Sequence, residues 1–291
     1  MKISGFIIIK NAVKNDYPVT EAIRSVLPLV DEMIVSIGDS EDDTLSLIQS
    51  IASDKIRIVH SVWDPALRQG GEVLAIETDK AFQHISPDAD WAFYIQADEV
   101  VHEKYHPVIL EAAKKYNDQK EVEGLLFRYT HFYGTYNYVG DSRRWYNREI
   151  RIIRNDKNIH SYKDAQGFRK DGRKLFVKLI DAHIYHYGWV KSPKQMHQKA
   201  KNIGKFWRTD EEWEQFLTAS DFWDFNNEYD SLVKFTGTHP AVMQERIKNQ
   251  NWKIELDISK KRFSFKERLL YFIEKITGKR LFDYKNYKIL R

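Results

Sequence analysis

The chain has 291 residues, of which 42% are apolar and 30% charged, and its formal net charge is +4. That length can bury a substantial core, and the composition is ordinary for a globular protein. The absence of cysteine excludes disulfides, zinc–thiolate sites and cysteine nucleophiles. No apolar run reaches the roughly 18 residues that a membrane-spanning helix needs. The first ten residues predict a strand and not a secretory signal, so we expect a cytoplasmic protein.

The first 125 residues alternate between strand and helix signals. Apolar runs predict strands over residues 3–9, 32–37, 55–62 and 91–95, and the segments between them predict helices over residues 19–27, 44–52 and 73–85. Such an alternation with short connections favours a parallel sheet with helices on both faces. We therefore expect an α/β fold.

The second half of the chain has a different pattern. Strand signals occur at residues 125–132, 149–154, 175–179 and 182–186, separated by polar loops, and helical periodicity returns over residues 193–206, 210–223 and 265–276. We therefore expect a mostly parallel sheet with a mixed β half and C-terminal helices. The predicted domains are residues 1–190, which bind ligand and carry the chemistry, and residues 191–291, a helical region with a basic, aromatic tail.

The fourth predicted strand ends in two adjacent carboxylates, Asp98 and Glu99. In open α/β sheets, ligands bind at the carboxyl ends of the strands. Carboxylates at that edge suit a hard divalent cation that bridges to phosphates. The alternative is that both residues cap the helix predicted over residues 103–116.

Two earlier strands also end in polar loops. The second is followed by Gly38-Asp-Ser-Glu-Asp-Asp-Thr44, and the third by a loop that contains Arg68 and Gly71. Arginine can reach a phosphate, and glycine lets backbone approach a ligand closely. The alternative for the acidic loop is a helix N-cap, favoured by the helix dipole.

Together these motifs resemble family 2 glycosyltransferases with the GT-A fold. Ser40, Asp42 and Thr44 match that family's Ser-x-Asp-x-Thr loop, and Gln96-Ala97-Asp98 stands where the family has its Asp-x-Asp metal motif. The resemblance implies sugar transfer from a nucleotide-sugar, a UDP-sugar in the first place, to a glycan or lipid-linked acceptor in bacterial surface-polysaccharide synthesis. The nucleotide-sugar-binding residues that it implies are Asn11, Asp39, Asp42, Arg68, Gly71, Gln96, Ala97 and Asp98.

The resemblance also implies a metal and a catalytic base. Mn²⁺ or Mg²⁺ would bind Asp98 and a late histidine, His186, with His239 as a rival. Inverting transfer needs a carboxylate that deprotonates the acceptor hydroxyl, and Asp164 is the first candidate, with Asp141 as the second. The family's first motif acid is replaced by Gln96, which weakens the metal assignment.

Two sets of residues supply candidate partner surfaces. Arg144, Trp145 and Trp189 are candidates for contact with the acceptor or a phosphate, and a surface loop with a buried tryptophan is the alternative. Residues 260–291 hold eleven Lys or Arg and three acids, a net charge of +8 that leaves −4 for the rest of the chain. This tail suits peripheral contact with the inner face of a membrane; a packed C-terminal helix is the alternative.

Two other functions compete with glycosyl transfer. A nucleotidyltransferase needs a glycine-rich loop after the first strand, where this chain has Lys10-Asn-Ala-Val-Lys14. A non-catalytic protein that binds anionic ligands could use only the tail, because the acids at three strand ends repel such ligands. We expect no nucleic acid partner.

Overall fold

The computed structural model describes residues 1–67, 70–204, 206–219 and 222–291. Arg68, a candidate phosphate ligand, lies outside these described residues. Four strands form the parallel part of the main sheet, in the spatial order β3, β2, β1, β4: β1 (Ile3–Ile9), β2 (Glu32–Ile37), β3 (Ile56–His60) and β4 (Trp91–Tyr94). This arrangement confirms the parallel sheet that the alternating sequence predicts.

The rest of the sheet is mixed. Next to β4 run β8 (Arg148–Arg154), antiparallel to it, and then β6 (Gly124–Tyr133), β7 (Thr135–Gly140) and β13 (Leu232–Lys234). The long strand β12 (Phe176–Trp189) lies parallel to β6 and also pairs with β5 (Glu99–Val101) and β14 (Lys288–Ile289). The expected mixed half is therefore confirmed.

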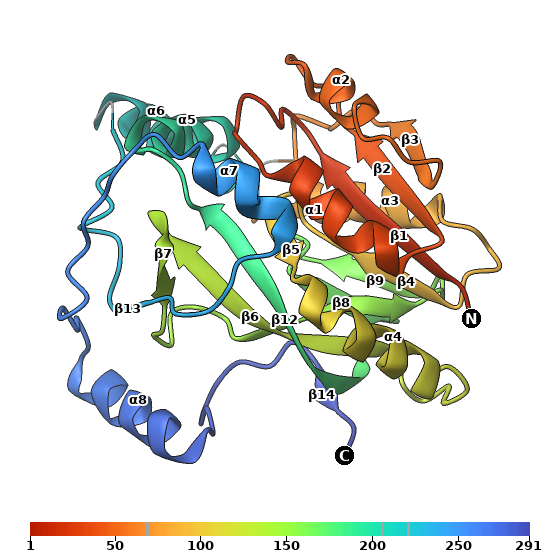
Figure 1. Ribbon diagram of the computed structural model, residues 1–291. Helices are drawn as coiled ribbons and strands as arrows, with labels where there is room; N and C mark the ends of the chain where they lie inside the picture. The colour runs from red at the N-terminus through yellow and green to blue at the C-terminus, as the bar shows by residue number, and fades with distance from the viewer. Residues whose placement is uncertain (68–69, 205, 220–221) are drawn as a thin grey trace.

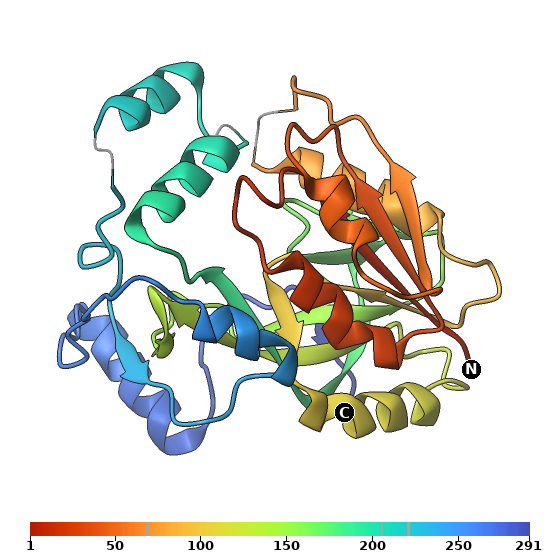
Figure 2. The same ribbon diagram turned by 45° about the horizontal axis from the view of Figure 1, so that its top comes forward.

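Helices cover both faces of the sheet (Figures 1 and 2). On one face, α1 (Val19–Val26), α2 (Thr44–Gln49) and α4 (His106–Lys115) pack on the odd-numbered residues of β1; on the other face, α3 (Glu72–Gln83) packs on Phe6 and Ile8. Alternate residues of a strand point to opposite faces, so β1, whose residues are all buried, serves both cores. Short 3₁₀ segments at Leu27–Leu29, Glu103–Tyr105 and Ala241–Met243 complete the turns.

Several elements differ from the expectations. The strands expected at residues 175–179 and 182–186 are one strand, β12, whose register with β6 shifts between Leu179 and His183. Such a bulge interrupts the alternation of side chains and explains the apparent gap. A small second sheet was not predicted and contains β9 (Ile159–Tyr162), β10 (Gly167–Lys170) and β11 (Arg173–Lys174).

The C-terminal region contains α5 (Pro193–Gly204), α6 (Asp210–Ala219), α7 (Gln244–Lys248) and α8 (Phe265–Thr277). It is tied to the first half: β14 pairs with β12, and the α7 residue Arg246 forms ion pairs with Asp16 and Glu21, each at 2.8 Å. Residues on the two sides of the predicted boundary near residue 190 are therefore in direct contact.

No helix in the described part of the chain is both long and apolar enough to cross a bilayer.

Candidate functional site

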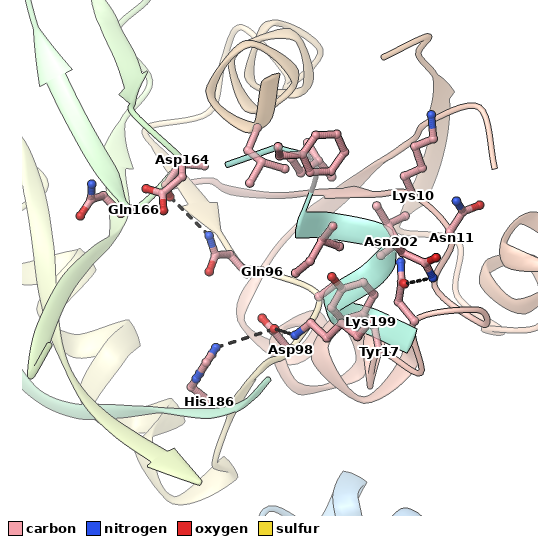
Figure 3. Close-up of a pocket in the computed structure, with 18 of the residues that line it drawn as sticks. Lys10, Asn11, Tyr17, Gln96, Asp98, Asp164, Gln166, His186, Lys199 and Asn202 are labelled. Atoms are coloured by element: carbon pink, nitrogen blue, oxygen red, sulfur yellow. Dashed lines mark hydrogen bonds and ion pairs between the residues drawn. The ribbon is translucent and has the colours of Figure 1, made fainter. Parts of the chain in front are cut away.

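A cavity of about 380 Å³ opens at the carboxyl ends of β1 and β4. Its walls come from the loop after β1, the end of β4, the loop between β9 and β10, and α5 (Figure 3). Its polar lining side chains are Lys10, Asn11, Asn15, Tyr17, Gln96, Asp98, Arg151, Asp164, Gln166, His186, Lys199 and Asn202. Segments that are far apart in the chain thus build one site at the edge where α/β sheets bind ligands.

Asp98 follows β4 and faces two basic side chains in this cavity (Figure 3). Its Oδ2 accepts a hydrogen bond from Nζ of Lys199 at 3.1 Å and lies 3.7 Å from Nε2 of His186. Burial alone would raise the pKa of this carboxyl, but the charge of Lys199 and its hydrogen bond hold the pKa of Asp98 well below its ordinary value. Asp98 is therefore ionised at neutral pH.

Glu99, the neighbouring acid, has a structural role and is fully buried. Nε and Nη2 of Arg151 each donate to it at 2.8 Å, and the hydroxyl of Tyr129 donates at 2.7 Å. A buried bidentate pair of this kind is well satisfied and costly to break. The expectation that Asp98 and Glu99 together serve a cation is therefore wrong: the chain turns between them and sends Glu99 into the interior.

A histidine pair sets the protonation of His186. Nε2 of His131 lies 2.7 Å from the carbonyl oxygen of Tyr146, and Nδ1 of His131 lies 3.1 Å from Nδ1 of His186. Burial lowers the pKa of both rings, so both are neutral. A carbonyl only accepts, so His131 carries its hydrogen on Nε2 and accepts the Nδ1–H of His186. Nε2 of His186 then presents a lone pair toward Asp98.

The space between Asp98 and His186 is kept open by Gly188. A Cβ atom at this position would lie 2.5 Å from Oδ2 of Asp98 and 2.8 Å from Nε2 of His186. One carboxylate and one imidazole lone pair, oriented by His131, are a suitable donor set for a divalent cation. No third His, Cys, Asp or Glu joins this pair among the residues that the structure describes. The residues present therefore fit a metal that takes its remaining ligands from phosphate or water.

Asp164 lines the same cavity across from Asp98 (Figure 3). Its Oδ1 is buried without a hydrogen-bond partner in the described part of the chain, and burial raises the pKa of this carboxyl. The residues on either side, Lys163 and Ala165, both have positive φ, at 56° and 60°. Non-glycine residues in that region mark strain, which is common at functional sites. Asp164 therefore has the features of a base that takes up a proton.

The predicted nucleotide ligands fall into two groups: one group lines the cavity or lies against it, and the other group consists of two acids that are not among its described lining residues. Asn11, Gln96 and Ala97 line the cavity, and Gly71 lies against Asp164, where a Cβ atom would come within 2.6 Å of that residue's Cβ. A glycine is required at this contact, because its φ of +74° also disfavours other residues.

Asp39 and Asp42 are not among the described residues that line the cavity. Oδ1 of Asp39 accepts from Nζ of Lys10 at 2.7 Å, and Oδ2 of Asp42 accepts from the backbone N–H of Lys14 at 2.7 Å. The backbone N–H of Asn11 likewise donates to Ser40, at 3.0 Å. The acidic loop therefore holds the loop after β1 in place, and its carboxylates act on the cavity only through that loop.

The second base candidate, Asp141, is engaged elsewhere. Its two oxygens accept hydrogen bonds from the hydroxyls of Ser231 and Tyr271, both at 2.5 Å. Lys261 and Lys275 lie 3.6 and 3.7 Å away. The structure therefore joins Asp141 to α8 and not to the cavity, and of the two base candidates only Asp164 lines the cavity.

The acceptor candidates also lie outside the described cavity lining. Nη1 of Arg144 donates to the carbonyl of Glu228 at 2.6 Å. Trp145 stacks on His131 and makes an edge contact with Trp189 at 6.1 Å. Trp145 therefore packs directly on the histidine pair, and Trp189 reaches it through Trp145. His239, the rival metal ligand, instead contacts the hydroxyl of Tyr187 at 2.8 Å, in a separate aromatic cluster.

Sequence reasoning missed the contribution of α5. Lys199, Asn202 and Ile203 project from one face of this helix into the cavity. Their spacing of three and four residues is the signal that could have identified them as a common face. Asn202 also donates to Oδ1 of Asn15 at 2.7 Å, which fixes α5 against the loop after β1.

No family model and no curated protein match the chain. Similar solved structures include S. aureus TarS 1-349 in complex with UDP, with 15% identity, coverage of 75% of this chain and 70% of that chain, and a TM-score of 0.37. They also include 4-diphosphocytidyl-2C-methyl-D-erythritol synthase from Anaerococcus prevotii, at 12% identity, 65% and 91% coverage, and a TM-score of 0.40. Glucosyl-3-phosphoglycerate synthase from Mycobacterium tuberculosis with Mn²⁺, UDP and phosphoglyceric acid shares 25% identity over 45% of this chain and 43% of that chain, with a TM-score of 0.30.

The chain spans 42% of a longer TarS structure, so it covers less than half of that protein and of the glucosyl-3-phosphoglycerate synthase. TM-scores of 0.40 and below mark only partial overlap. These likenesses do not by themselves assign a fold family or an activity.

Proposed function

We propose that this protein is a glycosyltransferase that moves a sugar from a nucleoside-diphosphate sugar, a UDP-sugar first of all, to a hydroxyl of a glycan or lipid-linked acceptor. The observation that carries the proposal is the pair of carboxylates in one cavity. Asp98 is ionised beside Lys199 and His186, and half-buried Asp164 has a buried Oδ1 with no hydrogen-bond partner among the described residues. The first suits a diphosphate leaving group, and the second suits an acceptor hydroxyl.

The donor side of the reaction belongs to Asp98 and His186. They would hold a divalent cation, Mn²⁺ or Mg²⁺, which when bound supplies positive charge to the departing diphosphate. Asn11 and Gln96 line the same wall and offer amide groups to the donor. Nε2 of Gln96 reaches the carbonyl of Ala165 at 3.4 Å, so it joins the donor wall to the loop that carries the base.

Asp164 would act on the acceptor. In an inverting transfer it takes the proton of the acceptor hydroxyl while the hydroxyl oxygen forms a bond to the anomeric carbon. The bond from that carbon to the diphosphate breaks, and the electron pair leaves with the diphosphate. Burial raises the pKa of Asp164, which strengthens it as a base once it is ionised. The strained residues beside it hold the carboxyl in place.

The test is a calorimetric panel of UDP-, GDP- and TDP-sugars with and without Mn²⁺, followed by product analysis. UDP and Mn²⁺ are the first probes, because solved structures with partial similarity contain them. Release of a nucleoside diphosphate supports sugar transfer. Release of pyrophosphate from an added nucleoside triphosphate would support nucleotidyl transfer instead, and no binding of any nucleotide-sugar would refute sugar transfer.

The Asp164→Asn variant separates binding from catalysis. We expect donor affinity to stay within about twofold and transfer to fall at least 100-fold, since removing a general base costs about 10²–10⁴. The Asp181→Asn variant is the control, because this acid is exposed on β12. Equal losses of binding and transfer in Asp164→Asn would show that Asp164 is not the base.

We also propose that α8 rests on an anionic membrane surface. Unlike most surface helices, α8 turns polar groups toward the protein: Tyr271 bonds Asp141 at 2.5 Å, and Glu274 pairs with Arg143 at 3.0 Å. Figures 1 and 2 show α8 at the periphery of the molecule. Its apolar side chains at i, i+4, i+7 and i+11 are exposed, with Phe265 at 87% and Ile276 at 67%.

The exposed apolar stripe lies among basic residues, and this combination favours an interface between headgroups and acyl chains. Co-sedimentation with phosphatidylglycerol vesicles, compared with phosphatidylcholine vesicles, tests the assignment. We expect the double variant Leu269→Ser/Phe272→Ser to lose binding, whereas Val62→Ser, at an exposed apolar position just after β3, should retain it. Equal binding by the double variant and the unaltered chain would refute the assignment.

A further inference from the structure

Lys199 on α5 is a buried cation with donor capacity to spare. Its side chain is 8% exposed, and Nζ donates to Oδ2 of Asp98 at 3.1 Å and to the carbonyl of Gly188 at 3.0 Å. The ring of Tyr17 lies 4.8 Å from the same nitrogen. An ammonium group has three N–H donors, and these two hydrogen bonds use two of them. Because Lys199 lines the cavity, its third N–H is available to a ligand there.

The other cations of the cavity wall have counter-ions of their own. Lys10 pairs with Asp39 at 2.7 Å, and Arg151 pairs with Glu99 at 2.8 Å. Neither carboxylate lines the cavity among the described residues. Ligand binding therefore leaves these two ion pairs in place.

Lys199 differs because its carboxylate partner, Asp98, is also the proposed metal ligand. Oδ2 of Asp98 and Nε2 of His186 both face the space that Gly188 keeps open. The same Oδ2 accepts the hydrogen bond from Lys199. A divalent cation on that oxygen repels the ammonium group and takes its counter-ion. A buried lysine without a partner is strongly unfavourable, so the nitrogen then needs another anion within reach.

We propose that Lys199 exchanges partners during donor binding: in the free protein it neutralises Asp98, and in the loaded protein it donates to an oxygen of the donor diphosphate. This inference rests on the proposed function, because it needs a diphosphate and a cation in the cavity. It makes Lys199 a ligand of the leaving group in addition to the metal. The flexible four-carbon stem of lysine lets the nitrogen, which lies over the ring of Tyr17, pivot without movement of α5.

The exchange makes cation binding and nucleotide binding depend on each other. A cation alone must displace Lys199 from Asp98 and leave the ammonium group without a counter-ion, so it binds poorly. A diphosphate gives Lys199 a new partner and frees Asp98, so it improves cation binding. By linkage, the cation improves nucleotide binding by the same factor.

The experiment measures two affinities in the full chain. Mn²⁺ binding without nucleotide is followed by electron paramagnetic resonance of the free ion, and UDP binding at saturating Mn²⁺ is followed by calorimetry. The test variant is Lys199→Gln, which removes the charge but keeps an N–H donor for Asp98. Lys194→Gln is the matched control, because it lies on α5 and its side chain does not line the cavity. Lys199→Met, measured in the same way, guards against a folding defect specific to glutamine.

We expect Lys199→Gln to bind Mn²⁺ alone about tenfold more tightly, because the competing ammonium is gone. UDP affinity at saturating Mn²⁺ should fall about tenfold to 100-fold, the range for loss of one charged hydrogen bond. Lys194→Gln should match the unaltered chain in both assays.

Three results would overturn the exchange. Unchanged Mn²⁺ affinity in Lys199→Gln would show that Lys199 does not compete for Asp98. Unchanged UDP affinity would show that it does not reach the diphosphate. If the unaltered chain binds neither UDP nor GDP, the proposed function fails as well; if it binds UDP and the variants bind equally, only the exchange fails.

Discussion

Substitution of Gly188 by alanine tests the geometry of the donor site most directly. The new Cβ would stand 2.5 Å from Oδ2 of Asp98 and 2.8 Å from Nε2 of His186, and real Cβ contacts below 3.0 Å essentially do not occur. The Asp98 oxygen must therefore retreat by at least 0.5 Å, from 2.5 to 3.0 Å, and His186 by at least 0.2 Å. Gly188 does not have a left-handed backbone, so only the lack of space opposes the substitution.

The expected loss follows from these displacements. Changes that shift metal ligands through their surroundings reduce affinity by about 10- to 100-fold. We therefore expect Mn²⁺-dependent UDP binding to Gly188→Ala to weaken by about that factor, with overpacking costing about 1–3 kcal/mol of stability. UDP binding without metal should change less, because the substitution acts on Asp98 and His186.

Calorimetry of UDP with and without Mn²⁺, together with thermal unfolding, provides the assay. Gly237→Ala is the control, since its Cβ would meet the ring of Phe235 at 2.8 Å, a similar crowding away from the cavity. If a folded Gly188→Ala protein keeps the unaltered Mn²⁺-dependent affinity, Asp98 and His186 do not share a cation, and the assignment of both residues is refuted.

Three further outcomes are expected. Glu99→Gln should lower the free energy of unfolding by about 3–5 kcal/mol, because it breaks the buried pair with Arg151; unchanged stability in urea titrations would contradict its structural role. Burial raises the pKa of Glu149 to about 8 from an ordinary value of 4.5, so the folded state binds the extra proton between these values and stability falls as pH rises through that window. Glu149→Gln should remove this fall, and an unchanged pH–stability profile would exclude Glu149 as its source. The pKa of Asp164 is also raised, so the transfer rate should fall as the pH is lowered through this pKa and Asp164 becomes protonated. The residual transfer of the Asp164→Asn variant should not show this fall.

The parallel half of the fold was accessible from the sequence because its information is local. Apolar runs such as Ile3–Ile9 have few alternatives to a buried strand, and the predicted bounds of β1 and β2 agree with the structure. Asp98 could be selected because it follows a recognisable strand, and Asp164 and His186 because of the resemblance to a known family; the structure brings all three to one cavity.

The rest depended on contacts between distant residues. Lys199 and Asp98 are 101 positions apart, and Arg151 and Glu99 are 52 apart. No periodicity within a window reveals such pairs. Asp98 and Glu99 illustrate the same limit, because neighbouring residues in extended chain point in opposite directions. The sequence shows two adjacent acids, whereas the turn before β5 decides that Asp98 lines the cavity and Glu99 is buried.

The position of α5 has a consequence for how the protein can be divided. Lys199, Asn202 and Ile203 line the same cavity as Asn11, Asn15 and Asp98 from the first half of the chain. The carbonyl of Phe206 also accepts a hydrogen bond from the N–H of Gly71 at 2.9 Å. A fragment ending at residue 190 would keep the parallel strands but present an open trough in place of an enclosed pocket. If the proposed donor binds in this cavity, early and late segments of the chain would recognise it together, and a bound nucleotide would protect both against unfolding.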